Sequence, residues 1–372
     1  MGRNKAIIFF CSDGNSLVNF RGTLIEDFIN KGYQVSAIAP NISCENKKFL
    51  QQLEVKVSLI SFQRKSLNPF SAVFSLISII KIIKATRPQF VFSYTHKPVV
   101  LGALASYLCG VPKIVSLITG TGHIFDNYSL VTRIKRFIGL MGFRFALRVS
   151  HFVIFQNKDD RYLFINLGLV DSLKTSVVNG SGVDLEHFHH SSLPSELTFL
   201  CLARLIKSKG LREYANACKI VRAQHPNATF LLGGSPDIHN DSIDINEIKA
   251  TWKNKYGIDY IGYIQDARDA IKKCNVYVLL SYNEGTPRTV LEAMAMGRPI
   301  ITTDVNGCRE TVQHGINGYL VPMQDHKSAA NHMLEFTDTE LIKNMGAESR
   351  KYCEIKYDVV RVNASIFEIL EI

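Results

Sequence analysis

Short runs of apolar, often β-branched residues recur along the whole chain, and segments with helical spacing of apolar residues separate them. Hydrophobicity within each run is continuous rather than alternating, which is typical of strands buried on both faces of a parallel sheet. The runs of the first half are 6–11, 34–39, 55–59, 90–94, 113–118 and 151–155. Those of the second half are 197–203, 229–232, 258–262, 276–280, 299–303 and 319–321.

This alternation predicts an α/β protein with two doubly wound, Rossmann-like parallel-sheet domains. We expect residues 1–182 to form the first domain and 183–356 the second, because the polar stretch 186–195 has the character of a linker. Residues 357–372 have apolar positions at helical spacing, and we expect this helix to pack back on the first domain. Ligands bind beyond the carboxyl ends of such strands, so the predicted site is a cleft across which the two domains face each other.

Charge is divided unevenly between the two halves. The 372 residues carry a net charge of +10, but residues 1–180 hold 22 Lys and Arg against 9 Asp and Glu, a net charge of +13. The first domain is therefore expected to meet an anionic partner: a membrane surface, a phosphorylated ligand or nucleic acid. Nucleic acid is the poorest explanation, because the sequence has no known binding module and no basic stripe with interleaved aromatics.

The cysteines and histidines give no clear metal site. None of the eight cysteines stands at C-x-x-C spacing, which argues against a zinc ribbon and a thioredoxin motif and favours a reducing, cytosolic compartment. His187, His189 and His190 are close in sequence, and surface positions explain them better than a metal does. The most hydrophobic stretches, 70–83 and 99–111, are shorter than the roughly 20 residues that span a bilayer, so we predict no transmembrane helix.

The segment 281–312 carries the most specific pattern. The predicted strand 276–280 ends in a polar loop, and a helix over 288–296 follows, with Thr286 as its expected N-cap and Pro287 at its first position. Gly297 is expected to end this helix. Its N-terminus would present N–H groups and the positive end of the helix dipole, which suits a diphosphate.

Two carboxylates flank this helix start. Glu284 precedes it and Glu292 lies eight residues later, within the helix. A carboxylate accepts hydrogen bonds from two adjacent hydroxyls, so the pair fits a sugar on one side of a diphosphate and a ribose on the other. The alternative is a helix-terminus charge with a surface salt bridge.

The Glu-x7-Glu spacing within EGTPRTVLEAMAMGRPII resembles the retaining, nucleotide-sugar-dependent glycosyltransferases of family 4, which have the GT-B fold. The elements at 177–184, 202–210, 231–235 and 260–263 also resemble that family's pattern. In the first half, 93–102 (SYTHKPVVLG) and 118–125 (ITGTGHIF) resemble the members that build lipid-linked oligosaccharides and surface polysaccharides.

The resemblance implies roles for individual residues. Arg204 and Lys209 contact the donor diphosphate, where two cations on one loop stabilise charge on the leaving group, although an ordinary solvated loop is the alternative. Glu284 contacts the transferred sugar and Glu292 the ribose hydroxyls. Glu284, Arg204 and Lys209 are the expected catalytic residues. The other expected donor-binding residues are Gly234, Tyr263, Ile264, Gly285, Thr286, Pro287, Arg288 and Thr289. Of these, main chain near Tyr263 and Ile264 is expected to meet the base, and the N–H groups near Thr286 to Thr289 to hold the diphosphate.

Neither a metal nor another cofactor is expected, because the chain contains no Asp-x-Asp motif and cations with a helix dipole can stabilise the leaving group. The family implies retention of anomeric configuration by front-side attack, with the leaving phosphate helping to accept the acceptor's proton. Thr119 stands where many relatives have a histidine. Whether any side chain of the first domain is directly catalytic therefore stays open.

Acceptor-side candidates come from the first domain. His96 and Lys97 follow a predicted strand and either contact the acceptor or form a local turn with Pro98. Gly14 and Asn15 lie in the first strand–helix loop, where they either line the acceptor side or make the turn.

A basic helix is predicted over 128–150. Its apolar residues fall within an arc of about 120°, and cationic residues flank that arc, as an interfacial helix on anionic lipid requires. The cationic residues are Arg133, Lys135, Arg136, Arg144 and Arg148. The alternative is a core helix with a solvated basic side.

Together these observations predict an enzyme that is cytoplasmic and peripheral on the inner face of the membrane. It would move a sugar, with retention, from a nucleotide-diphosphate donor, with UDP-sugar as the expected class, to a lipid-diphosphate-linked saccharide. The alternatives are a GT-B nucleotide-sugar epimerase and a catalytically silent GT-B binding subunit.

Overall fold

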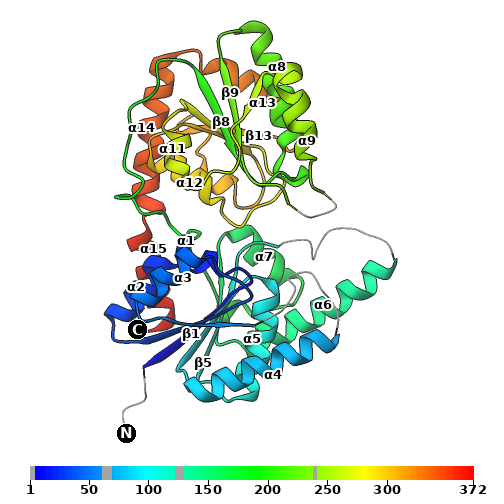
Figure 1. Ribbon diagram of the computed structural model, residues 1–372, viewed down its shortest axis with the longest axis vertical. Helices are drawn as coiled ribbons and strands as arrows, with labels where there is room; N and C mark the ends of the chain where they lie inside the picture. The colour runs from blue at the N-terminus through cyan, green and yellow to red at the C-terminus, as the bar shows by residue number, and fades with distance from the viewer. Residues whose placement is uncertain (1–4, 61–68, 122–129, 238–240) are drawn as a thin grey trace. The chain divides into compact units, whose positions relative to one another are not determined.

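The computed structural model describes residues 5–60, 69–121, 130–237 and 241–372, and for residues 69–72 and 130–138 it describes the backbone only. The chain forms two compact units (Figure 1). Unit 1 comprises Met1–Ser181 and Asn363–Ile372, and unit 2 comprises Gly182–Val362. The last ten residues of the chain therefore fold with its beginning.

The described part of unit 1 contains a seven-stranded, fully parallel sheet in the order β3-β2-β1-β4-β5-β6-β7. Every residue of β1 and β4 is buried, as continuous hydrophobicity predicts for central parallel strands. The strands are β1 Ala6–Phe10, β2 Gln34–Ala39, β3 Lys56–Leu59, β4 Phe90–Tyr94, β5 Lys113–Ile118, β6 Phe152–Phe155 and β7 Thr175–Val177.

Helices connect these strands, and α5 packs against both α4 and α6 (Figure 1). The helices of unit 1 are α1 Asn15–Asn19, α2 Gly22–Asn30, α3 Cys44–Gln52, α4 Pro69–Thr86, α5 His96–Leu108, α6 Leu130–Val149 and α7 Lys158–Asn166. The terminal helix α15, Val359–Leu370, contacts α2 through the rings of Phe28 and Phe367, whose centroids are 4.9 Å apart.

Within the residues that the structure describes, unit 2 has a six-stranded, fully parallel sheet in the order β10-β9-β8-β11-β12-β13. Its strands are β8 Thr198–Leu202, β9 Thr229–Gly233, β10 Ile258–Tyr260, β11 Val276–Leu279, β12 Ile300–Thr303 and β13 Gly318–Val321. Its helices are α8 Leu211–Gln224, α9 Ile245–Glu247, α10 Lys253–Tyr256, α11 Ala267–Ile271, α12 Arg288–Ala295, α13 His326–Glu335 and α14 Thr339–Lys356.

The prediction of two doubly wound parallel sheets is confirmed, and each of the twelve predicted runs overlaps a strand. Strand β7 was not predicted. It has three half-buried residues at the sheet edge beside β6, too short a stretch to show a hydrophobic pattern.

Each sheet has one point where the strand order reverses, and in this kind of fold ligands bind there, at the carboxyl ends of the two strands. In unit 1 that point lies between β1 and β4, and in unit 2 between β8 and β11. The loops that follow these four strands are therefore where functional side chains are expected.

The stretch 186–195, predicted to be a linker, packs against unit 2. The guanidinium of Arg298 is fully buried and donates to the carbonyl oxygens of Ser191 and Ser192, at 2.8 and 3.0 Å. It also donates to Ser191 Oγ and to the carbonyl oxygens of Ile271 and Met296. Arg298 thus holds Ser191 and Ser192 against the end of α12, and Arg350 donates to the carbonyl oxygen of Phe188 at 3.0 Å.

Candidate functional site

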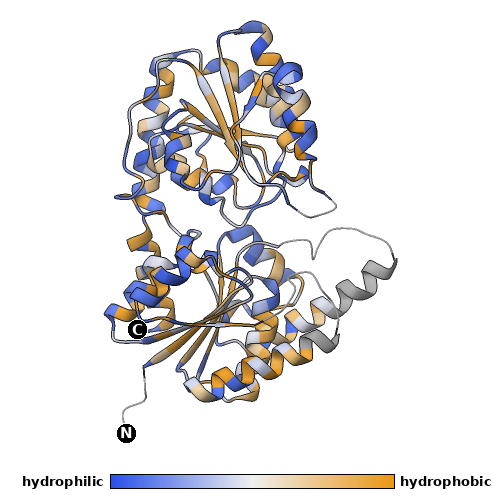
Figure 2. Cartoon of the chain, viewed as in Figure 1, coloured by the Kyte–Doolittle hydropathy of each residue, from blue (hydrophilic) through white to orange (hydrophobic). Residues whose placement is uncertain are grey.

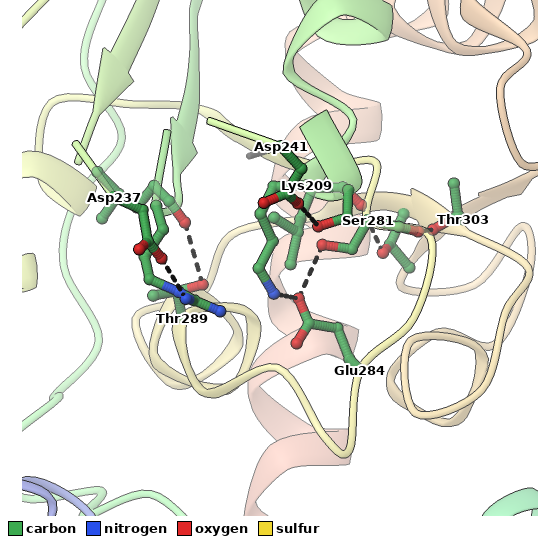
Figure 3. A network of polar contacts seen from close by, with 12 residues as sticks. Lys209, Asp237, Asp241, Ser281, Glu284, Thr289 and Thr303 are labelled. Atoms are coloured by element: carbon green, nitrogen blue, oxygen red, sulfur yellow. Dashed lines mark hydrogen bonds and ion pairs between the residues drawn. The ribbon is translucent and has the colours of Figure 1, made fainter. Parts of the chain in front are cut away.

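The loops after β8 and β11 join where the strand order of unit 2 reverses. Lys209 ends a 3-10 turn after β8, and its Nζ forms an ion pair with Oε1 of Glu284, in the loop after β11. Ser281 Oγ donates to the same carboxylate oxygen at 2.7 Å. The Lys209 and Glu284 side chains are only 16% and 17% exposed, and Figure 3 shows them pointing toward one another. The predicted catalytic lysine and glutamate therefore lie together at the carboxyl edge of the sheet.

Backbone contacts fix the two loops against each other. The N–H of Tyr282 donates to the carbonyl oxygen of Ser208 at 2.9 Å, and the Tyr282 hydroxyl donates to Glu213 at 2.8 Å. Burial and the Glu213 carboxylate raise the pKa of Tyr282 to about 12. Gly210 has a φ of 66°, and a Cβ there would lie 1.9 Å from the carbonyl oxygen of Leu280, so only glycine fits. The Tyr282–Glu213 contact could not be predicted from a sequence pattern, because 69 residues separate its partners.

Arg204, the second predicted cation, pairs with an aspartate that the sequence analysis did not single out. Its NH1 lies 2.6 Å from Oδ2 of Asp237, which follows β9. The Arg204 side chain is 48% exposed, whereas that of Asp237 is 12% exposed. The main chains of the two loops also join, since the N–H of Leu205 donates to the carbonyl oxygen of Ser235 at 3.0 Å.

The N-cap of helix α12 lies one residue later than predicted, at Pro287 rather than at Thr286. Pro287 occupies the N-cap position with φ −72° and ψ 108°, so helical dihedrals begin only at Arg288. The Thr286 hydroxyl donates to the carbonyl oxygen of Gly285 at 2.9 Å instead of capping the helix. The predicted end is confirmed: Gly297 is left-handed at φ 79°, and its N–H donates to Met294.

The first turn of α12 lies against the end of β8. Thr289 Oγ1 is 3.5 Å from the carbonyl oxygen of Leu202, the last residue of that strand. Gly307 supports the loop that precedes the helix: a Cβ at this position would lie 2.3 Å from the carbonyl oxygen of Gly285. The N-terminus of α12 therefore lies beside the carboxyl end of β8.

Glu292 is buried within α12, so its ion pair with Arg288 is not a surface salt bridge. Its side chain is 12% exposed, and Arg288 Nε donates to it at 3.0 Å. Burial raises the pKa of the Glu292 carboxyl, and the neighbouring Arg288 offsets part of that effect.

Gly234, Tyr263 and Ile264 lie at the ends of β9 and β10. Gly234 has a φ of 152°, and a Cβ there would lie 1.8 Å from the carbonyl oxygen of Ala203. The backbone segments at these two residues therefore approach as closely as glycine allows. Its N–H donates to Gly262 at 2.8 Å. Tyr263 is 72% exposed, whereas Ile264 packs against the core.

In unit 1, His96 and Lys97 begin α5 where the strand order reverses between β1 and β4. His96 Nε2 lies 2.9 Å from the carbonyl oxygen of Thr121. Burial lowers the pKa of Lys97. The preceding Thr95 has a φ of 68°, and its Oγ1 donates to Ser12 Oγ at 2.8 Å, which ties the β4 end to the β1 end.

The contacts of Gly14 and Asn15 favour the turn interpretation. The N–H of Gly14 donates to the carbonyl oxygen of Asn41 at 2.9 Å, and a Cβ at Gly14 would lie 2.1 Å from that oxygen. Asn15 Oδ1 accepts from the N–H of Ser43 and from Asn46 Nδ2, at 2.9 and 3.0 Å. The side chain of Asn15 thereby fixes the start of α3. Thr119 follows β5 and is half-buried.

The described residues contain no group of three or more His, Cys, Asp or Glu placed to hold a metal ion. No helix in the described ranges combines the length and apolar character that crossing a bilayer requires. The side chains of Arg133, Lys135 and Arg136 lie outside the described residues, whereas Arg144 and Arg148 are exposed on α6.

Two family models match the chain, one on each unit. Residues 7–157 match the model described as glycosyl transferase 4-like, and residues 196–339 match glycosyl transferases group 1. The second match contains the loops of Arg204, Lys209 and Glu284 and all of α12.

Similar proteins and structures agree with these matches. The N,N'-diacetylbacillosaminyl-diphospho-undecaprenol alpha-1,3-N-acetylgalactosaminyltransferase of Campylobacter jejuni is 25% identical over 364 residues, covering 94% of each chain. The UDP-Gal:alpha-D-GlcNAc-diphosphoundecaprenol alpha-1,3-galactosyltransferase of Escherichia coli is 26% identical over 301 residues, covering 77% of this chain and 76% of that protein. Anabaena Alr3699/HepE in complex with UDP-glucose is 20% identical with a TM-score of 0.78, covering 98% of this chain and 99% of that structure.

Proposed function

Because this chain belongs to the glycosyltransferases that join a glycosyl transferase 4-like half to a group 1 half in the GT-B fold, we propose that it transfers a sugar from a UDP-sugar to a lipid-diphosphate-linked saccharide. The observation that carries this proposal is the meeting of Lys209, Glu284 and the start of α12 at one edge of the unit 2 sheet. The names of the two bacterial relatives support the acceptor class, since both act on sugars linked to diphospho-undecaprenol.

The diphosphate is assigned to Arg204, Lys209 and the N-terminus of α12. Guanidinium and ammonium groups form strong, charge-assisted hydrogen bonds with phosphate, and main-chain N–H groups at a helix start add to them. The backbone from Gly285 to Thr289 supplies those N–H groups, with Pro287 excepted. Positive charge from the protein thus stabilises the leaving diphosphate, and the proposed reaction uses no metal.

We assign the ribose, the base and the transferred sugar of the donor to the neighbouring loops of unit 2. Glu292, buried beside Arg288, accepts hydrogen bonds from the ribose hydroxyls. The base lies by the main chain near Gly234, Tyr263 and Ile264. Glu284 contacts the transferred sugar, where Lys209 and Ser281 hold its carboxylate in place.

The proposed chemistry is a front-side displacement with retention. The bond between the sugar's anomeric carbon and the β-phosphate oxygen breaks, and a bond to the acceptor hydroxyl oxygen forms on the same face. The acceptor's proton passes to the departing phosphate oxygen, so UDP is the other product. His96, Lys97 and Thr119 are assigned to the acceptor side, at the carboxyl edge of the unit 1 sheet.

We expect the purified protein to bind UDP-sugar and to label a lipid-linked saccharide fraction when the sugar is radioactive. Glu284→Gln should lower transfer by about 100-fold or more while UDP itself binds within a few-fold of the wild-type affinity, because glutamine keeps the volume but not the charge. Calorimetry with UDP-, GDP- and ADP-sugars measures the donor preference.

Three results would count against this function. Conversion of the donor sugar without acceptor would identify an epimerase. Donor binding with no label in any lipid fraction would identify a binding subunit. Loss of UDP binding in Glu284→Gln would assign this glutamate to the nucleotide rather than to the sugar.

We further propose that unit 1 lies on the anionic inner face of the cytoplasmic membrane through α4, α5 and α6. These three helices contain eight Lys and Arg residues and no Asp or Glu. Val73, Phe74 and Ile77 are exposed on α4, Phe74 by 70%, and Lys81 and Lys84 continue the same face of the helix. Apolar positions stand out on α4 and α5 in Figure 2.

Helix α6 repeats this arrangement. Met141, Arg144, Phe145 and Arg148 are exposed at helical spacing, so apolar and cationic side chains share one face. The Phe145 ring meets Tyr107 of α5 with 5.8 Å between centroids, beside a hollow of about 700 Å³ that Arg148 also lines. Apolar side chains among cations fit an interface between lipid head groups and acyl chains.

The membrane proposal predicts salt-sensitive binding to anionic vesicles. Replacing Arg144 and Arg148 with glutamate should weaken binding to phosphatidylglycerol vesicles by about tenfold or more, because each cation near an anionic surface contributes about 1 kcal/mol. Vesicle flotation at low and high salt measures this change in binding. Glutamate at Arg212 and Arg222, exposed on α8 of unit 2, is the matched control. Equal binding by both double variants, or no vesicle binding by the wild type, would refute the proposal.

A further inference from the structure

Each of the three cations at the unit 2 site already has a carboxylate partner. Arg204 pairs with Asp237 at 2.6 Å, Arg288 with Glu292 at 3.0 Å, and Lys209 with Glu284. These six side chains therefore carry no net charge together. An incoming diphosphate competes with carboxylates for the cations that bind it.

Asp237 differs from the other two carboxylates because it has no place in the proposed contacts with donor hydroxyls. It comes from a third loop, after β9, and is held there by the main-chain contact between Ser235 and Leu205. Its carboxylate is mostly buried, whereas the Arg204 guanidinium is about half exposed. The arginine can therefore turn toward a ligand while the aspartate stays in the loop. Figure 3 shows Asp237 and its ion pair in the same view as Lys209 and Glu284.

We propose that Asp237 is the counter-ion that the donor diphosphate replaces on Arg204. This inference rests on the proposed donor site and adds a residue that sets its affinity. Before binding, the Asp237 carboxylate neutralises Arg204. After binding, it lies near the diphosphate with its former partner engaged elsewhere. Both effects oppose binding of the nucleotide, so Asp237 weakens the complex with the donor and favours release of the nucleoside diphosphate product.

The test is the affinity for UDP measured by calorimetry on the full chain. Asp237→Asn should bind UDP about three- to tenfold more tightly than the wild type, because asparagine keeps the shape and removes the competing charge. Affinity for uridine, which carries no phosphate, should not change. Asp241→Asn is the matched control: it removes the same charge nearby, where Asp241 accepts from Ser208 Oγ at 3.1 Å, and should leave UDP affinity unchanged.

A second variant separates a charge effect from a structural one. If Asp237 acts through Arg204, the gain in affinity should disappear when Asp237→Asn is combined with Arg204→Met. Weaker or unchanged UDP binding in Asp237→Asn would overturn the inference, as would an equal gain in Asp241→Asn. Wild-type protein that binds no nucleoside diphosphate would overturn the proposed function as well, whereas wild-type binding with no gain in the variant would overturn this inference alone.

Discussion

Replacing Lys209 with methionine should lower the rate of sugar transfer by about 10²–10³-fold, the loss typical when one group that stabilises developing charge is removed. Methionine keeps the length and apolar stem of lysine but not its charge. The ammonium lies in a mostly buried position where water screens it poorly, and it holds the Glu284 carboxylate as well as the proposed diphosphate. Transfer from UDP-sugar at saturating donor measures the change, and UDP affinity should fall too.

Lys207 provides the matched control for this prediction. It lies in the same 3-10 turn, two residues earlier, and its side chain is exposed. Lys207→Met removes the same charge from the same turn and should change the transfer rate by less than about threefold, because solvent screens exposed charges. Equal losses in the two variants would mean that the turn contributes only general positive charge.

Replacing Arg298 with methionine should destabilise unit 2 by about 3–4 kcal/mol, the largest effect on stability that we expect from a single side chain. The guanidinium is fully buried and satisfies carbonyl oxygens of Ser191, Ser192 and Met296. Methionine fills most of the volume but removes the donor from the buried carbonyls of Ile271 and Met296 and from the partly buried carbonyls of Ser191 and Ser192, each buried one at a cost of about 1–3 kcal/mol that relaxation partly offsets. Urea denaturation followed by circular dichroism measures the change.

Arg212 is the control for the stability prediction. It forms an exposed ion pair with Glu247, with NH2 and Oε2 3.1 Å apart, and such surface pairs contribute less than about 1 kcal/mol. Arg212→Met should therefore leave the unfolding midpoint nearly unchanged. A loss of less than 1 kcal/mol in Arg298→Met would show that water reaches the freed carbonyl groups and that the arginine is not the anchor of 186–195.

The architecture was predictable because central parallel strands carry an unbroken apolar run, as β1, β4 and β8 do. The end of α12 was predictable for a local reason, since Gly297 supplies the left-handed residue that stops a helix. Its N-cap was misplaced by one residue, because the choice between Thr286 and Pro287 depends on the ψ angle of the proline.

The ion pairs of the candidate site were beyond what the sequence pattern predicts. Arg204 and Asp237 are 33 residues apart, and Lys209 and Glu284 are 75 apart. Only the order β9-β8-β11 brings their three loops to one edge. The burial of Arg298 could not be predicted either, because nothing in the sequence around it distinguishes a buried arginine from a solvated one.

The return of the chain's last ten residues to unit 1 has a consequence for biosynthesis. Phe367 closes over Phe28, Asn363 Nδ2 donates to Asp27 at 2.7 Å, and Glu371 pairs with Lys113 at 2.8 Å. A ribosome finishes all of unit 2 before it releases these residues. Unit 1 is thus completed only after unit 2 has been made, and a nascent chain stopped at residue 181 would leave the ring of Phe28 without its aromatic partner from α15.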